Sequence, residues 1–509
     1  MSISKHNGIT TLAPVFLLMI SAFGTLTFVV GDATQALHQT GKIASKKNGI
    51  LVLPPPPKPE GTTLPKDEWF VQKLDHFNDA DTRMWNQRFF RNATFYKPTS
   101  AGVSVVFLMI GGEGPANPVW MVTGQWIKYA QIFNAYCLML EHRFYGKSHP
   151  TANASTQNLQ HLSSEQALAD LANFRASMAE KLGFKNSKWI VFGGSYPGSL
   201  AAWFRLKYPH LVDGAVAASA PVFAQLNFKN YLAVVQDAFG PTCSGAFAKG
   251  TQTIEQLLLH QTGARIVSST FKTCKPIMIT SQMDVWNFYS ILAGNIENVV
   301  QYNKDNRAFE GALGTNITVD VVCKMMMTTS DKFQGLADVS NLLLAADKQK
   351  CLDNSYADLV KSLKSTDWND DIAGRSWVYQ TCTEFGFFQS SDLPNQPFGP
   401  NFPLKFFVQQ CVDVFGEKFN STFIADGVHR TNINYGGYDI TKVTKVIFYN
   451  GSVDPWHALG VPKSSRSAAY VTGTAHCANM YPDSSNDLPA LINVRKREVN
   501  LIHQWLQEA

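Results

Sequence analysis

The sequence has few charged residues, and no stretch of it carries a long run of charge of one sign. Asp, Glu, Lys and Arg make up 16% of the 509 residues, and the net charge is +5. A nucleic-acid-binding chain gathers basic residues into a patch, so no nucleic-acid partner is expected. Internal repeats are also missing, whereas the hydrophobic content of 45% is typical of a globular protein.

Long apolar runs are missing as well, except for one near the N-terminus. It extends from about Leu12 to Val30, after Lys5, and is followed by Gly31. This pattern predicts a secretory signal peptide over residues 1–31, although its length also allows an uncleaved membrane anchor. With the signal cleaved, we expect a secreted or lysosomal protein with no stable membrane association.

Residues 32–67 are expected to form a linker or a propeptide. Positions 54–57 are four consecutive prolines, which favour an extended polyproline conformation that does not join a core. We therefore expect order to begin near Glu68.

Six short apolar runs after this segment have the pattern of buried parallel strands. They are residues 103–110, 135–140, 189–192, 214–218, 445–449 and 468–471. Helical patterns separate several of them, which predicts an α/β fold. The series is interrupted over residues 223–441, where mixed helical periodicity predicts a mostly helical cap. The core would then consist of residues 68–222 and 442–509, with the cap inserted between them.

The cysteines and glycosylation sequons agree with an oxidising compartment. Cys137 lies in an apolar run and is expected to be a buried free thiol. Six cysteines fall in the predicted cap, and the sequence alone allows fifteen pairings among them: Cys243, Cys274, Cys323, Cys351, Cys382 and Cys411. Sequons that predict glycosylation occur at Asn92, Asn153, Asn316 and Asn420, with a further sequon at Asn450.

A serine on a tight turn marks the candidate active site. Gly193-Gly194-Ser195 follows the predicted strand 189–192 and precedes a helix start rich in small residues. This is the pattern of the nucleophile elbow of α/β-hydrolases, which identifies Ser195 as the candidate nucleophile. Pro197 stands where that pattern has glycine, so an ordinary glycine-rich turn is the alternative. Proline is nevertheless tolerated in the first turn of a helix.

The partners that a serine nucleophile needs follow in the expected order. A base must take its proton, and an acid must orient the base. Asp454 follows the predicted strand 445–449 and His476 follows 468–471, which matches the order Ser, Asp, His of α/β-hydrolases. His457 is the competing base, but it lies on the same loop as Asp454.

The developing oxyanion needs two main-chain N–H donors. One is the residue after the nucleophile, Tyr196, and the other belongs to the loop after the strand 103–110. That loop contains Gly111 and Gly112, whose missing side chains allow close approach to a ligand.

Several motifs together resemble the serine carboxypeptidase S28 family, and in particular its member thymus-specific serine protease. They are WFVQKLDHF at 69–77, GGEG at 111–114, LEHRFYGKS at 140–148, GGSY at 193–196, ASAPV at 218–222, WVYQTCTEFG at 377–386 and NGSVDPW at 450–456. The resemblance implies an α/β-hydrolase core with a helical cap and peptidase chemistry carried by Ser195, Asp454 and His476. It also implies disulfides Cys243–Cys323, Cys274–Cys351 and Cys382–Cys411, with Cys137 and Cys477 free.

The family resemblance implies peptide substrates cleaved at proline, in either a carboxypeptidase or a dipeptidyl-peptidase mode. Apolar and acidic candidates for the substrate pocket are Glu113, Trp377, Tyr379, Glu384 and Trp456, together with Phe387 and Phe388. Glu113 or Glu384 could bind a substrate amino group, whereas Arg143 or Lys147 could bind a carboxylate, so the sequence leaves the mode open. In an acidic lysosome, His476 would have to stay neutral below its usual pKa of about 6.5.

Two other classes of protein share parts of this pattern. A carboxylesterase or lipase has the same fold and triad, and a catalytically silent binding protein has the fold alone. No cofactor and no metal are expected, and a homodimer remains open.

Overall fold

The structure is a computed structural model that describes residues 53–99, 102–184, 186–304, 317–369 and 372–508. The expected signal peptide and the sequon at Asn316 lie outside these residues. In the described part, eight strands form one sheet in the order β1-β2-β4-β3-β5-β6-β9-β10. The strands are β1 (Glu68–Lys73), β2 (Met84–Asn92), β3 (Ser104–Ile110), β4 (Tyr136–Leu140), β5 (Ser187–Gly194), β6 (Gly214–Ala218), β9 (Val446–Gly451) and β10 (Ala468–Val471).

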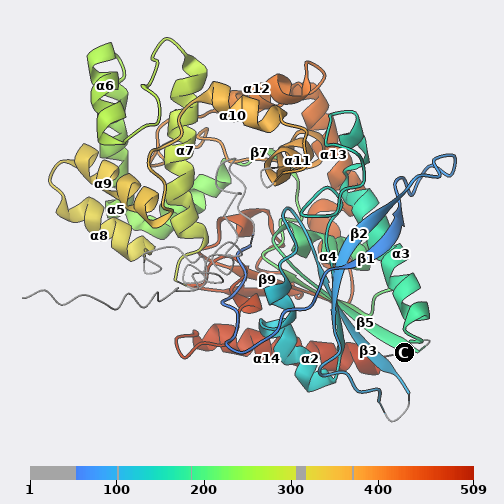
Figure 1. Ribbon diagram of the computed structural model, residues 1–509. Coiled ribbons are helices and arrows are strands. Elements are labelled where there is room, and N and C mark those ends of the chain that lie inside the picture. The colour runs from blue at the N-terminus through green and yellow to red at the C-terminus, as the bar shows by residue number, and fades with distance from the viewer. Residues whose placement is uncertain (1–52, 100–101, 185, 305–316, 370–371, 509) are drawn as a thin grey trace, which may run out of the picture. The chain divides into compact units, whose positions relative to one another are not determined.

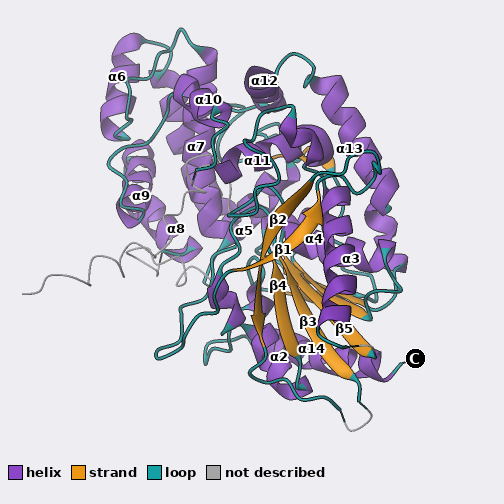
Figure 2. Cartoon of the chain, turned by 45° about the vertical axis from the view of Figure 1, so that its right-hand side comes forward, coloured by secondary structure: helices purple, strands orange, loops and turns teal. Residues whose placement is uncertain are grey.

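The six predicted apolar runs all form strands, and they lie next to one another in parallel from β4 to β10. Helices cover both faces of this sheet: α3 (Ser164–Lys181) and α4 (Tyr196–Lys207) on one side, α2 (Gln125–Phe133) and α14 (Pro489–Gln507) on the other (Figure 2). Alternate residues of β3 serve the two faces, with Val106 and Leu108 packing on the first and Phe107 and Met109 on the second. This is the α/β-hydrolase architecture that the sequence predicts.

The first two strands, β1 and β2, are an addition to the predicted set. They form an antiparallel hairpin, and β2 also pairs antiparallel with β4. Side chains of β1 alternate between partly covered and exposed positions, so this strand has no continuous apolar run by which the sequence could reveal it.

The proline-rich segment packs on the core, contrary to the expectation that order begins near Glu68. Leu53 contacts the apolar cluster on the α2 and α14 face, and Pro56 is buried. The hydroxyl of Tyr481 donates a hydrogen bond to the carbonyl of Pro54 at 2.7 Å. Polyproline backbone has no internal hydrogen bonds, so its carbonyls remain available to such donors.

The chain between β6 and β9 forms the cap (Figure 1). Its helices are α5 (Asn230–Leu257), α6 (Gln261–Thr270), α7 (Gln282–Gln301), α8 (Val319–Thr328), α9 (Lys332–Ala346), α10 (Tyr356–Lys364), α11 (Ile372–Gln380), α12 (Leu404–Phe415) and α13 (Ser421–Tyr435), with a short parallel pair of strands, β7 (Gln225–Asn227) and β8 (Gly386–Phe388). Three disulfides join described residues of the cap, Cys243–Cys323, Cys274–Cys351 and Cys382–Cys411. These are the pairs that the family resemblance implies. Cys137 and Cys477 are buried free cysteines.

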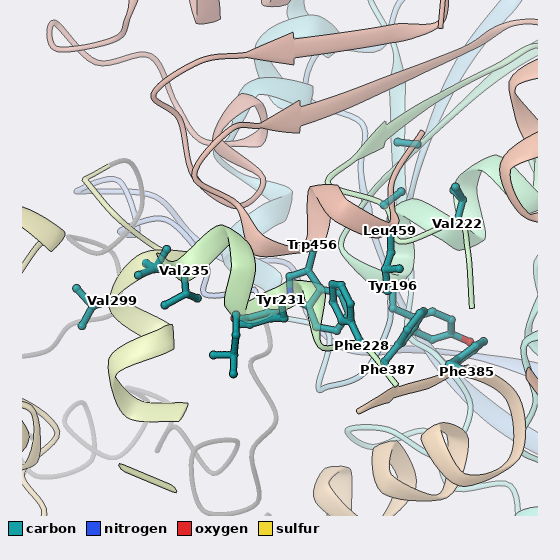
Figure 3. Close-up of a cluster of buried hydrophobic side chains, with 14 of the residues drawn as sticks. Tyr196, Val222, Phe228, Tyr231, Val235, Val299, Phe385, Phe387, Trp456 and Leu459 are labelled. Atoms are coloured by element: carbon teal, nitrogen blue, oxygen red, sulfur yellow. The ribbon is translucent and has the colours of Figure 1, made fainter. Parts of the chain in front are cut away.

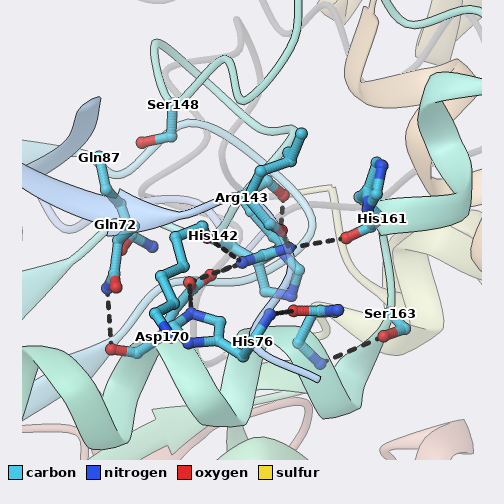
Figure 4. A network of polar contacts seen from close by, with 12 residues as sticks. Gln72, His76, Gln87, His142, Arg143, Ser148, His161, Ser163 and Asp170 are labelled. Carbon is cyan, nitrogen blue, oxygen red and sulfur yellow. Dashed lines mark hydrogen bonds and ion pairs between the residues drawn. The ribbon is translucent and has the colours of Figure 1, made fainter. Parts of the chain in front are cut away.

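A buried ion pair joins the β1–β2 region to the sheet and to α3 (Figure 4). Arg143 donates from Nε and Nη2 to the two carboxylate oxygens of Asp170, at 2.6 and 2.7 Å. Its Nη1 donates to the carbonyls of Leu74 and His161, both at 2.9 Å. Burial alone would raise the pKa of Asp170, but the Arg143 charge and its hydrogen bonds outweigh this and lower it. The guanidinium therefore has a structural role here.

In the described ranges, none of the helices combines the length and the apolar character that crossing a bilayer requires. The same residues contain no cluster of three or more His, Cys, Asp or Glu side chains suited to a metal ion.

Candidate active site

Ser195 lies on a strained turn between β5 and α4. Its φ of 66° and ψ of −135° fall where residues other than glycine are rarely found. Its N–H donates to the carbonyl of Ala218 at 2.9 Å, which fixes the turn against β6. Glycine is required on either side: a Cβ at Gly193 would lie 2.0 Å from the carbonyl oxygen of Pro197, and one at Gly198 would lie 2.7 Å from that of Ala218.

Pro197 occupies the second position of α4, where a helix N–H has no partner within the helix. Its ring packs on the loop after β3, because a Cβ at Gly112 would lie 2.3 Å from Pro197 Cγ. The departure from the elbow pattern therefore joins the serine turn to the loop that was expected to complete the oxyanion hole.

The main-chain N–H of Gly111 already has a partner within the sheet. Its N–H donates to the carbonyl of Leu140 at 2.9 Å, which continues the pairing of β3 with β4. Of the two glycines predicted to supply the second donor, Gly112 therefore stays the candidate, and Tyr196, the other predicted donor, is the first residue of α4. Sequence reasoning could not separate the two glycines, since both follow the strand directly.

Asp454 and His476 meet at the carboxyl ends of β9 and β10. His476 Nδ1 donates to Asp454 Oδ1 at 2.9 Å, and both side chains are fully buried. The same carboxylate oxygen accepts from the N–H of Trp456 at 3.0 Å, which fixes its orientation. His457, the competing base, has its Nδ1 2.7 Å from the main-chain carbonyl of Asp454 and does not reach the carboxylate that His476 occupies.

The pKa of His476 is raised well above its usual value. Burial lowers it, but the negative Asp454 carboxylate and the neighbouring Cys477 act in the opposite direction and prevail. This direction is opposite to what a neutral base in an acidic compartment would need.

Glu113 lies near both the serine and the histidine. It follows Gly112 on the loop after β3, and its side chain is close enough to Ser195 and His476 for both to favour its ionised form. Burial raises the pKa of Glu113 to about 7, although its own main-chain N–H, His476 and Ser195 favour the ionised form. Three predicted residues, Glu113, Ser195 and His476, are thus gathered at one place.

The cap holds the loops of this site through Gln301, the last residue of α7. Its side-chain oxygen accepts from the indole N–H of Trp456 at 2.9 Å and from the hydroxyl of Tyr231 at 2.8 Å. Its main-chain carbonyl accepts from the N–H of His476 at 2.9 Å. The ring of Tyr302, next in the chain, meets the His476 ring edge to face. Sequence reasoning missed Gln301, because the residue pattern of a cap helix does not indicate which of its side chains contact loops of the core.

A cavity of about 410 Å³ opens between the core and the cap beside Ser195. Trp456 packs in its wall against Phe228, Tyr231 and Phe387, with ring centroids 5.4 to 5.9 Å apart (Figure 3). Of the predicted pocket residues, Glu113, Trp377, Trp456, Phe387 and Phe388 line the cavity.

Tyr379 and Glu384 do not line this cavity. The ring of Tyr379 packs on Phe415 and Phe419. Glu384 accepts hydrogen bonds from the N–H and hydroxyl of Ser164, at 2.9 and 2.6 Å. Both belong to the contact between cap and core, where aromatic and acidic residues serve packing as well as they would serve binding.

The predicted cations are also engaged elsewhere. Arg143 pairs with Asp170, and Lys147 Nζ lies 2.6 Å from Asp67 Oδ2 at the surface. Neither lines the cavity, so neither is placed to bind a substrate carboxylate there.

The sequons differ in accessibility. Asn420 is exposed at the start of α13, whereas Asn92 and Asn153 are partly buried. Asn450 is 2% exposed, so its sequon cannot accept a glycan in the folded protein.

The fold and the serine turn define the class of the protein, an α/β-hydrolase with a helical cap. The model of the serine carboxypeptidase S28 family matches residues 72–498, and the chain belongs to this family. It is a serine-type peptidase.

Three relatives illustrate the similarity. A Caenorhabditis elegans protein named as a serine protease is 37% identical over 459 residues, covering 86% of this chain and 84% of its own. Thymus-specific serine protease of Homo sapiens is 34% identical over 471 residues, covering 89% and 88%. Lysosomal Pro-X carboxypeptidase of Bos taurus is 30% identical over 463 residues, covering 86% and 88%.

Among solved structures, proline iminopeptidase of Mycobacterium smegmatis is 11% identical, with a TM-score of 0.36, and covers 86% of this chain and 98% of its own.

Proposed function

We propose that the protein is a secreted or lysosomal serine exopeptidase that hydrolyses short peptides at proline. The observation that carries the proposal is the position of Ser195 in the wall of the cavity between core and cap, with Glu113 near both the serine and His476 of the buried Asp454–His476 pair. The cap restricts the space around the serine, which favours chain ends and short peptides over folded proteins.

In the proposed reaction, Ser195 Oγ attacks the scissile carbonyl while His476 takes its proton. Asp454 accepts from His476 Nδ1, so Nε2 is the nitrogen left to exchange a proton with Ser195. The N–H groups of Tyr196 and Gly112 would stabilise the oxyanion. His476 then returns the proton to the leaving amine, and water hydrolyses the acyl-enzyme by the same route.

Specificity for proline is supported by the character of the cavity wall. Trp377, Phe387 and Trp456 present flat apolar surfaces beside the serine, and a pyrrolidine ring packs well on such surfaces. One relative bears the name lysosomal Pro-X carboxypeptidase, which agrees with recognition of proline. We also propose the division into core residues 68–222 and 442–509 and cap residues 223–441.

Secretion is supported by the N-terminal apolar run and by the disulfides of the cap. Among the predicted glycosylation sites that the structure describes, Asn420 is the most accessible. Mass spectrometry of the secreted protein would test whether it carries a glycan.

The triad is tested by labelling with a fluorophosphonate probe and by peptide hydrolysis. Ser195→Ala should abolish labelling, and His476→Ala should lower kcat by about 10⁴-fold or more. His457→Ala is the matched control, because it removes an imidazole from the neighbouring loop and should retain labelling. Labelling that survives Ser195→Ala, or equal losses in the two histidine variants, would contradict the proposed triad.

Substrate preference is tested with a peptide library that has proline in internal, penultimate and second positions. Products that end in proline are expected. A wild-type protein that labels with the probe but hydrolyses only p-nitrophenyl esters would instead be an esterase.

A further inference from the structure

One face of α7 lines the cavity that holds Ser195, mostly with polar side chains. Asn287, Ser290 and Asn298 lie on it at helical spacing, with Glu297 beside them; Gly294, Ile291 and Asn295 of the same helix also line the cavity. The same face continues to Gln301, which contacts Trp456 and Tyr231. The stripe therefore extends the site away from the serine along the cap.

Two oxygen atoms on this stripe are buried without a hydrogen-bond partner among the described residues, Glu297 Oε1 and Asn298 Oδ1. Their side chains are only 4% and 3% exposed. A buried carboxyl or amide oxygen without a partner loses about 1–3 kcal/mol or more relative to a hydrogen-bonded one. Folding gains nothing from this arrangement, so a ligand is the natural partner for both atoms.

The charge around Glu297 is consistent with this. Burial alone raises its pKa to about 8, with no opposing contribution from a nearby cation. A carboxyl in that state becomes ionised when a positive group binds beside it. Besides burial, the charges of Glu297 and Asp454 both contribute to the raised pKa of Tyr231. Glu297 therefore lies near the proposed triad.

The sign of the cavity lining favours a cationic ligand. Its buried charged side chains, among the described residues, are Glu113 and Glu297. Lys350 and Asp353 also line the cavity, but both are exposed and of opposite sign. A substrate carboxylate would thus enter beside two buried acids.

We propose that Glu297 and Asn298 bind a primary ammonium group of the peptide substrate. An ammonium group has three N–H donors, and these two side chains supply one charged and one neutral acceptor. The inference rests on the proposed peptidase function and adds to it the chemical group of the peptide that is recognised. If the group is the α-ammonium, the enzyme releases short peptides from the N-terminus; if it belongs to lysine, the enzyme selects for that side chain.

The test compares three chromogenic substrates: Ala-Pro-p-nitroanilide, N-acetyl-Ala-Pro-p-nitroanilide and N-acetyl-Lys-Pro-p-nitroanilide. At least one of the two substrates with an ammonium group should be cleaved faster than N-acetyl-Ala-Pro-p-nitroanilide. Which of them is faster distinguishes the α-ammonium from the lysine side chain. Glu297→Gln should lower kcat/KM for the preferred substrate by about 10- to 100-fold, since hydrogen bonds to charged groups contribute about 1.5–3 kcal/mol.

The loss in Glu297→Gln should appear mainly in KM, because ammonium binding precedes the chemical step. Hydrolysis of N-acetyl-Ala-Pro-p-nitroanilide and labelling by the fluorophosphonate should stay at wild-type levels. Asn298→Ala is a second variant, in case Glu297→Gln does not fold, and should lower kcat/KM by about 3- to 10-fold for the loss of a neutral hydrogen bond. Glu417→Gln, at an exposed site outside the cavity, is the matched control for loss of a negative charge.

Equal hydrolysis of all three substrates by the wild type would overturn the ammonium site and leave the proposed function in place. An equal loss on all three in Glu297→Gln, with labelling retained, would do the same. The ammonium site would also be overturned if the wild type hydrolysed an N-blocked peptide with a free C-terminus faster than either substrate that has an ammonium group. Absence of hydrolysis of every peptide by the wild type would overturn both proposals.

Discussion

The side-chain oxygen of Gln301 accepts a hydrogen bond from the indole N–H of Trp456, 2.9 Å away. The first residue ends a cap helix, and the second lies two positions after Asp454. Through this bond and the one from His476 N–H to its carbonyl, Gln301 contacts both loops that supply the proposed triad. The cap therefore holds the site in shape as well as enclosing it.

Replacement of Gln301 with Ala should destabilise the protein by about 2–4 kcal/mol, because Trp456 and Tyr231 would each lose the acceptor of a buried donor. The free energy of unfolding in urea measures this loss. In a Tyr231→Phe background one of these donors is gone, so the same replacement should cost less. Strict additivity of the two changes would show that the hydrogen bond from Tyr231 contributes nothing.

The pH dependence of kcat/KM should have its acid limb above pH 6.5. The pKa of His476 is raised by Asp454 and Cys477 against the effect of burial, and a general base acts only when deprotonated. Activity should therefore rise as the pH increases through this pKa. Glu113→Gln removes a neighbouring negative charge and should shift the limb to lower pH. An acid limb below pH 6, or no shift in the variant, would contradict this assignment.

Thermal stability should decrease between about pH 5 and pH 8. Burial raises the pKa values of Glu113 and Glu498 to about 7 and that of Glu297 to about 8, from 4.5. The folded chain thus holds protons that the unfolded chain has lost, so stability falls as the pH rises through these values. Each unit of pKa difference corresponds to about 1.4 kcal/mol. In Glu297→Gln the melting temperature should depend less steeply on pH across this range. An unchanged slope would argue that Glu297 does not titrate there.

Asp170→Asn should lower the free energy of unfolding by about 3–5 kcal/mol, because it leaves the buried guanidinium of Arg143 without its carboxylate. Asp81→Asn is the control: it removes the partner of Arg83, a residue whose side chain is 62% exposed, and should change stability little. Variants should be compared by urea unfolding. An unchanged free energy of unfolding in Asp170→Asn would contradict the structural role of this ion pair.

Much of the fold could be predicted because it depends on strands buried on both faces. Runs such as 103–110 and 214–218 are apolar at nearly every position, and a strand between two helical layers requires this. The order of Ser195, Asp454 and His476 was visible for a related reason, since each follows a strand and the carboxyl ends of parallel strands share one edge. The β1–β2 hairpin was missed because its exposed positions interrupt the apolar pattern.

The residues that line the cavity were harder to predict, because residue type alone does not determine whether a side chain faces the cavity or packs between cap and core. Glu297 and Glu384 are both acids of the cap, yet Glu384 is satisfied by Ser164 and Glu297 lines the cavity. A signal for the α7 stripe was present: Asn287, Gly294, Asn298 and Gln301 recur at intervals of seven, four and three. Small and polar residues that recur at helical spacing indicate a helix face that is not packed in the apolar core.

The proline-rich segment covers part of the core directly behind the serine turn. A Cβ at Gly194 would lie 2.3 Å from Met480 Sδ and 3.2 Å from Leu53 Cδ2, so the leucine covers the reverse side of the serine turn. Cleavage between Leu53 and Glu68 would uncover apolar surface directly behind the nucleophile. A recombinant chain that starts at or before Leu53 keeps this surface covered.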